Sequence, residues 1–175
     1  MNFKILKHVI RLIIIIVLLA IIDSSCFTVK YSTSGASISP DLKTLSVIPF
    51  QNRSSAPPSF SQDITNKLID KCRSNTSLTL ITEGGEANFE GEIIGYDTRP
   101  TAIQGNETAA QNRFTITIHV RFTNSVDPKF NFDTNFSRYK DYGSSLTLDD
   151  AANLYTPEIV DQLLEDIFNK AFVNW

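Results

Sequence analysis

The stretch RFTITIHVRFTN, residues 113–124, alternates strictly between apolar and polar side chains. Phe, Ile and Val occupy the even positions from Phe114 to Phe122, whereas Arg, Thr and His occupy the odd positions. Because successive side chains of a β-strand point to opposite faces of the sheet, the pattern predicts a strand with one buried face. The other face is expected to meet water or a partner. Any helices must therefore cover the same face of the sheet.

Further strands are predicted on both sides of this stretch, at residues 42–50, 88–96 and 130–142. Residues 77–81 form a short strand or a strand entry. A turn is expected at Gly84-Gly85, because the spacing of a phosphate-binding loop is missing there. SVDPK, residues 125–129, predicts a hairpin turn. The polar segment 97–112 is longer than a hairpin requires, and such segments are usually functional or disordered.

Two amphipathic helices are predicted. The first spans residues 60–73, with Ser59 and Gln62 spaced as a capping box. The second spans residues 157–175, with Thr156 as N-cap and Pro157 at the first helical position. Together these elements predict an α+β fold, a two-layer sandwich in which two helices cover one face of a roughly four-stranded mixed or antiparallel sheet.

The N-terminus has the layout of a bacterial lipoprotein signal. Basic residues precede an apolar run, residues 12–22, and the small pair Ser24-Ser25 leads into Cys26. We therefore predict a signal peptide at residues 1–25, a lipidated N-terminus and tether at 26–40, and a single domain at 41–175. Acyl chains such as palmitate on Cys26 would form the membrane anchor.

Three other interpretations of this N-terminus compete with the lipoprotein signal. A transmembrane helix needs about 20 apolar residues, roughly twice the length of this run. A secretory signal cleaved without lipidation normally carries an A-x-A type site. A core helix that is apolar all round is unusual at an extreme N-terminus. Asp23 stands where lipoprotein signals usually have an aliphatic residue.

Composition limits the classes of function. Removal of residues 1–25 would leave 150 residues with 13 basic and 18 acidic side chains, because three basic residues and Asp23 are lost. A net charge of about −5 argues against a nucleic-acid partner. With Cys26 acylated, Cys72 has no disulfide partner, and its place on the apolar stripe of the first helix indicates a small buried side chain.

No constellation of residues indicates catalysis, a cofactor or a metal ion. His119 is the one histidine after residue 25, and a lone histidine on an alternating strand is more often a surface or cross-strand residue than a base. The acidic pairs Asp149-Asp150 and Glu165-Asp166 are expected to be solvated, because adjacent helical residues diverge. His119, Arg121, Arg138 and Lys140 form either a basic patch for a phosphate-bearing ligand or scattered surface charge.

Three segments carry a resemblance to a known family: FEGEIIGY at 89–96, AIQGNETAA at 102–110 and EDIFNKA at 165–171. With them the chain resembles the LptE family of LPS-assembly lipoproteins, of the type found in Bacteroidetes. The resemblance implies a sheet with two packed helices and no catalytic residues. It also implies lipidation at Cys26, an outer-membrane anchor facing the periplasm, and partnership with an LptD-type β-barrel in lipopolysaccharide transport. No lipopolysaccharide-contacting residue carries over.

A second function remains open. SVIPF, residues 46–50, followed by a helix is similar to lipoprotein subunits of secretion or curli-type assemblies, which would form homo-oligomeric rings. Particle size in mild detergent separates such rings from a complex with a β-barrel. An enzyme is disfavoured by the lack of any acid, base or nucleophile constellation.

Overall fold

The strand predicted from RFTITIHVRFTN lies inside the sheet, between two other long strands. The computed structural model of the chain describes residues 38–101 and 111–173, all of which belong to one compact unit, Ser34–Trp175. The predicted signal peptide, Cys26 and most of the predicted tether lie outside the described residues. The single domain at 41–175 stays a prediction.

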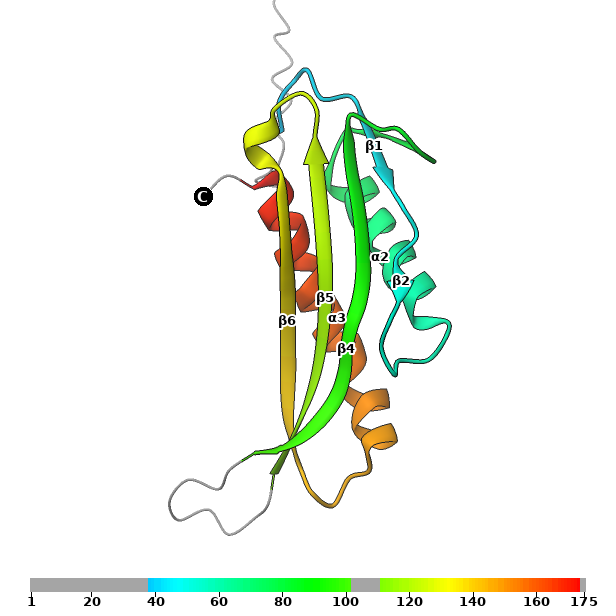
Figure 1. Ribbon diagram of the computed structural model, residues 1–175, viewed down its shortest axis with the longest axis vertical. Helices are drawn as coiled ribbons and strands as arrows, with labels where there is room; N and C mark the ends of the chain where they lie inside the picture. Colours follow the sequence, from blue (N-terminus) through cyan, green and yellow to red (C-terminus); the bar gives the residue numbers. More distant parts are fainter. Residues whose placement is uncertain (1–37, 102–110, 174–175) are drawn as a thin grey trace, which may run out of the picture. The chain divides into compact units, whose positions relative to one another are not determined.

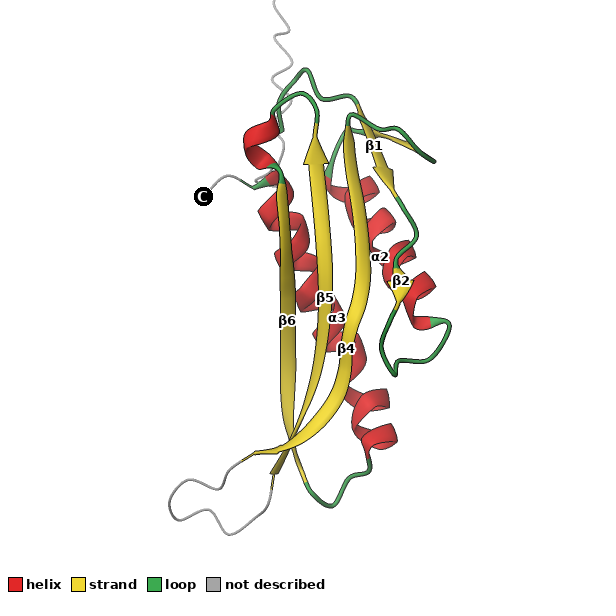
Figure 2. Ribbon diagram, viewed as in Figure 1, coloured by secondary structure: helices red, strands yellow, loops and turns green. Residues whose placement is uncertain are grey.

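Six strands form one mixed sheet (Figures 1 and 2). They are β1 (Thr44–Val47), β2 (Gln51–Asn52), β3 (Thr79–Ile81), β4 (Ala87–Thr101), β5 (Gln111–Asn124) and β6 (Phe132–Gly143). The order is β3-β1-β4-β5-β6, with β2 paired to β4. β1 runs parallel to both β3 and β4, whereas the three long strands β4, β5 and β6 are antiparallel neighbours.

Both described α-helices, α2 (Phe60–Asn75) and α3 (Leu148–Phe172), lie on the same side of the sheet (Figure 2). This confirms the α+β sandwich and the single apolar face predicted from the alternation in β5. The sheet has six strands rather than about four. The added strands are the short β2, which follows the strand predicted at residues 42–50, and β3, predicted as a short strand or strand entry.

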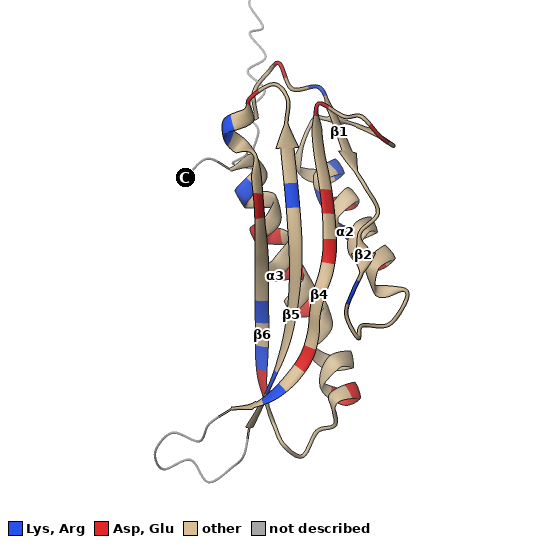
Figure 3. Ribbon diagram, viewed as in Figure 1, with Lys and Arg blue, Asp and Glu red and all other residues tan. Residues whose placement is uncertain are grey.

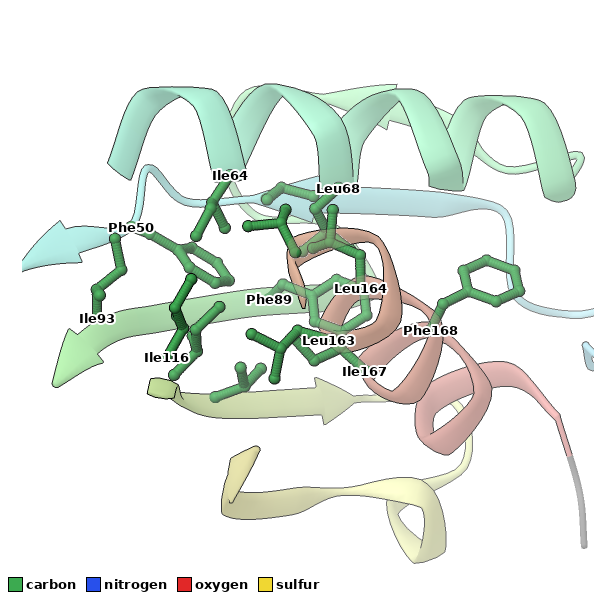
Figure 4. Packing of buried hydrophobic residues seen from close by; sticks show 14 of the residues in the cluster. Phe50, Ile64, Leu68, Phe89, Ile93, Ile116, Leu163, Leu164, Ile167 and Phe168 are labelled. Atoms are coloured by element: carbon green, nitrogen blue, oxygen red, sulfur yellow. The ribbon is translucent and has the colours of Figure 1, made fainter. Parts of the chain in front are cut away.

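The core fills the space between the sheet and the two helices. Figure 4 shows side chains from α2, α3, β4 and β5 meeting there. The even-numbered residues of β5 from Phe114 to Phe122 are completely buried, as are Ile64 and Leu68 of α2 and Leu163 and Ile167 of α3. Burial of apolar surface at about 25 cal/mol per Å² therefore holds both helices to one face of the sheet.

The start of α3 differs most from the sequence prediction. The helix begins at Leu148 and not at Pro157, and Thr147 is the N-cap, whose side-chain oxygen accepts a hydrogen bond from the amide of Asp150. Pro157 consequently lies inside the helix. The predicted cap at Thr156 was wrong, because the first turns of α3 bury Ala151 and Ala152 and this packing offsets the cost of an internal proline.

Other features also differ from the sequence prediction. Ser59 precedes α2 as predicted, but its backbone is helical and its side chain makes no capping hydrogen bond, so the predicted capping box was wrong. β4 and β5 extend to Thr101 and Gln111, so much of the predicted polar loop 97–112 is strand. Phe130 lies in a 3-10 helix, η1 (Pro128–Phe130), rather than in β6.

No helix in the described ranges is both long enough and apolar enough to cross a membrane.

Candidate functional site

The sheet has one face that none of the described residues covers, which we call the open face. It carries the odd-numbered side chains of β5 and β6. Their cross-strand neighbours on β4 include Glu90, Glu92, Asp97 and Arg99, because residues paired directly in an antiparallel ladder share a face. Figure 3 shows acidic and basic positions interspersed along these three strands.

One ion cluster on the open face centres on Asp133. Its Oδ1 lies 2.5 Å from His119 Nε2, and its Oδ2 accepts a hydrogen bond from Arg121 Nε at 3.0 Å. Arg121 also lies 4.0 Å from a carboxylate oxygen of Glu90. The hydrogen bonds from Arg121 and then His119 lower the pKa of Asp133. His119 is thus a cross-strand partner, as predicted.

A second ion cluster lies toward the other end of the same strands. Arg113 donates to both carboxylate oxygens of Asp141, at 2.7 and 2.9 Å. This bidentate pair lowers the pKa of Asp141. The guanidinium carbon of Arg113 lies 3.7 Å from the ring centroid of Tyr139, which is 52% exposed. The guanidinium of Arg113 is therefore held both by the carboxylate of Asp141 and over the ring of Tyr139.

Small residues separate the two ion clusters. Gly95 and Thr117 are paired across β4 and β5, and the hydroxyl oxygens of Thr117 and Ser137 lie 3.0 Å apart. The open face is therefore polar, and its charges are largely compensated within the sheet. Such a surface can lie against water or a polar wall without leaving buried charges unpaired.

The acidic stripe of α3 is held by cations from both neighbouring elements. From α2, Lys67 pairs with Asp161 at 2.9 Å, and Lys71 pairs with Glu165. The other two pairs, from β6, are Arg138 with Asp166 at 2.6 Å and Lys140 with Glu158 at 2.8 Å. Glu165 is exposed and Asp166 is half-buried, so both reach solvent as predicted, but each also forms an ion pair that the sequence did not indicate. The two carboxylates do diverge as expected, and each finds a cation on a different element.

Of the two alternatives for His119, Arg121, Arg138 and Lys140, the structure excludes a single basic patch. His119 and Arg121 lie on the open face, whereas Arg138 and Lys140 pair with α3 on the opposite face. The physical reason is the period of two in a strand: Arg138 and Lys140 occupy even positions of β6, which face the helices. Their charges are also already matched by carboxylates.

The described residues contain no cluster of three or more potential metal ligands. The thiol of Cys72 is buried, and burial raises its pKa to about 12, so it is not a nucleophile near neutral pH. Cys26, the predicted lipidation site, lies outside the described residues, as do residues 102–110 of the polar segment 97–112.

A comparison with protein families identifies the chain. The LptE family, described as Lipopolysaccharide-assembly, matches residues 42–171, a range that contains all six strands and nearly all of α3. The chain belongs to the LptE family. The fold described above is therefore that of an LptE-family domain, and the resemblance carried by residues 89–96 and 165–171 is confirmed. The Bacteroidetes type stays a prediction.

Several solved structures are similar to this LptE-family chain at low sequence identity. A hypothetical protein from Chlamydia trachomatis is 11% identical and has a TM-score of 0.51, over 76% of this chain and 99% of that one. A minor lipoprotein from Acinetobacter baumannii is 14% identical and has a TM-score of 0.46, over 72% of this chain and 89% of that one. The PelC dodecamer from Paraburkholderia phytofirmans is 9% identical and has a TM-score of 0.46, over 78% of this chain and 94% of that one. No curated protein matches the sequence significantly.

Proposed function

We propose that the protein is an outer-membrane lipoprotein that pairs with an LptD-type β-barrel and acts as its plug and assembly factor in lipopolysaccharide transport. The observation that carries this proposal is the LptE-family match across residues 42–171. The proposed action is binding and not catalysis. Lipopolysaccharide is the proposed cargo of the complex, and the barrel is the proposed direct partner.

The polar character of the open face supports the proposal that the protein lies within a water-filled barrel. The interior of large outer-membrane barrels is polar, so a plug needs a polar and charge-compensated exterior. The pairs of Asp133 with Arg121 and of Asp141 with Arg113 meet that requirement, because each charge already has a partner before the barrel is reached.

Membrane attachment is proposed to occur through Cys26. The basic residues, apolar run and small pair before Cys26 support processing at this residue, followed by retention through acyl chains. Phe27 follows the cysteine, where an Asp would favour the inner membrane in enterobacterial lipoproteins. The domain would then face the periplasm from the outer membrane.

The decisive experiment is a pull-down of C-terminally tagged protein from detergent-solubilised outer membranes, followed by a salt wash and mass spectrometry. We expect a large β-barrel of the LptD type in stoichiometric amount. Recovery of the protein alone, as a ring or a monomer, would overturn the proposal.

Lipidation is tested separately. Cells that express the native chain or Cys26→Ala are labelled with radioactive palmitate, and we expect label only in the native chain. Equal labelling of both chains, or of neither, would contradict an anchor at Cys26.

A further inference from the structure

A groove lies between α2 and α3, and we call it the α2/α3 groove. Its volume is about 460 Å³, within the range of binding sites for small groups. The floor consists of Phe60 and Ile64 from α2, Tyr96 from β4 and Val160 from α3. Apolar side chains thus line a concave surface between two helices. The groove is distinct from the open face, which lies on the other side of the sheet.

Acidic side chains give the rim of the groove its charge. Asp63 and Asp70 both line it, and the side chain of Asp63 has no hydrogen-bond or ion-pair partner in the described part of the chain. Asp70 pairs with Arg73 at 2.7 Å, one turn further along α2. Lys67 is the basic residue of the lining, and it is neutralised by Asp161 at 2.9 Å. The rim therefore favours a cation.

Two hydrogen-bond acceptors of α3 beside the groove lack a usual donor. Pro157 has no N–H, so the carbonyl of Asn153 lacks the donor that an α-helix normally supplies four residues later. The hydroxyl oxygen of Thr156 is buried and has no partner among the described residues. Asn153, Thr156 and Pro157 all line the groove. The carbonyl of Asn153 can accept a hydrogen bond from an incoming N–H group, and the hydroxyl of Thr156 can do so once its side chain turns toward the groove.

We propose that the α2/α3 groove binds a protein segment in which an Arg or Lys lies next to bulky apolar side chains. The apolar side chains contact Phe60, Ile64 and Val160, and the cationic head donates to the carbonyl of Asn153 and the hydroxyl of Thr156. Asp63 adds the opposite charge. An acyl chain under an anionic headgroup would also fill the apolar floor, but its charge would face the carboxylates of the rim. This inference does not depend on the proposed pairing with a β-barrel.

The test measures fluorescence polarisation of a fluorescein-labelled peptide amide, Leu-Arg-Leu-Phe, added to the full chain as processed in cells and purified in a nonionic detergent. Matched peptides carry neutral citrulline or Glu in place of Arg. We expect saturable binding of the Arg peptide, and binding of the other two that is weaker by at least about fivefold. No saturable binding, or equal binding of the citrulline peptide, would overturn the proposal.

Two variants assign the binding to the groove. Thr156→Val keeps the shape but removes the hydroxyl, and we expect unchanged or higher stability with about twofold to tenfold weaker peptide binding. Asp63→Asn should weaken binding about twofold to fivefold, whereas Glu83→Gln, a matched change at an exposed turn, should not. Native affinity in Thr156→Val and Asp63→Asn, or displacement of the peptide by lysophosphatidylglycerol, would overturn the assignment.

Discussion

Substitution of Gly85 by Ala tests the packing at the start of β4. A Cβ atom on Gly85 would lie 2.5 Å from the amide nitrogen of Ser46, 2.6 Å from the carbonyl oxygen of Ala87 and 2.8 Å from the carbonyl carbon of Leu45. All three atoms belong to the backbone, so no side-chain rotation relieves the contacts. Ordinary contacts begin at 3.4 Å, and the backbone must therefore retreat by roughly 0.6–0.9 Å, the difference between these distances.

The expected cost has two parts. Overpacking of a well-packed region typically costs about 1–3 kcal/mol. The movement also weakens the 3.1 Å hydrogen bond that the amide of Gly85 donates to the hydroxyl of Ser46, a buried residue, and this adds about 1 kcal/mol. We therefore expect Gly85→Ala to lower the free energy of unfolding by about 2–4 kcal/mol.

The assay is urea denaturation of the purified chain followed by far-UV circular dichroism. The midpoint should fall by about 1–2 M in Gly85→Ala, from typical urea slopes for a chain of this size. Gly84→Ala is the matched control. Gly84 has a φ of 74°, but no heavy atom lies within 4 Å of the place that a Cβ would occupy, so the change should cost only about 1 kcal/mol of backbone strain. A Gly85→Ala protein as stable as Gly84→Ala would refute the steric argument.

Three further predictions concern α3, the buried thiol and the open face. Thr147→Ala removes the N-cap of α3 and should cost about 0.5–2 kcal/mol in urea denaturation, whereas Ser59→Ala should cost much less because Ser59 makes no capping hydrogen bond; equal losses would contradict the reassigned start of α3. Cys72, with its pKa raised to about 12, should resist iodoacetamide at about pH 8 until urea unfolds the chain, as read by mass spectrometry, and rapid labelling of the folded protein would contradict its burial. The pKa values of Asp133 and Asp141 are lowered in the folded state, so their contribution to stability is present above the unfolded value of about 4 and is lost as the pH falls through the lower folded values. Asp141→Asn should therefore flatten the loss of stability between about pH 5 and pH 2, and an unchanged pH profile would show that the pair with Arg113 does not act in this way.

Local sequence patterns predicted the wrong start for α3, because more than one local structure is compatible with the same residues. Pro157 suits the first turn of a helix, and Thr156 before it suits an N-cap, so these two residues alone favour a start at that point. Thr147 and Asp150, three residues later, have the spacing of an N-cap and its hydrogen-bond partner, and the structure uses them instead. The choice goes with the burial of Ala151 and Ala152, which depends on packing against segments remote in sequence.

The charged residues show the same limit. Sequence alone put His119 on the polar side of its strand, and this was correct. The period of two in β6 puts Arg138 and Lys140 on the same face as Phe132 and Phe136, but their ion pairs with α3 join residues far apart in the chain, and no local signal indicated them. The α2/α3 groove also brings together distant segments, from α2, β4 and α3, and no local signal indicates it.

Residue patterns were sufficient to predict the alternating central strand, the two amphipathic helices, the α+β class and the family to which the chain belongs. These features depend on periodicity and on local residue choice, which act over a few residues. Folding in three dimensions was needed to establish the parallel pairing of β1, the added strand β2, the start of α3 and the partners of its carboxylates. These depend on contacts between segments remote in sequence, and their free energy is set by burial and charge pairing after the chain has folded.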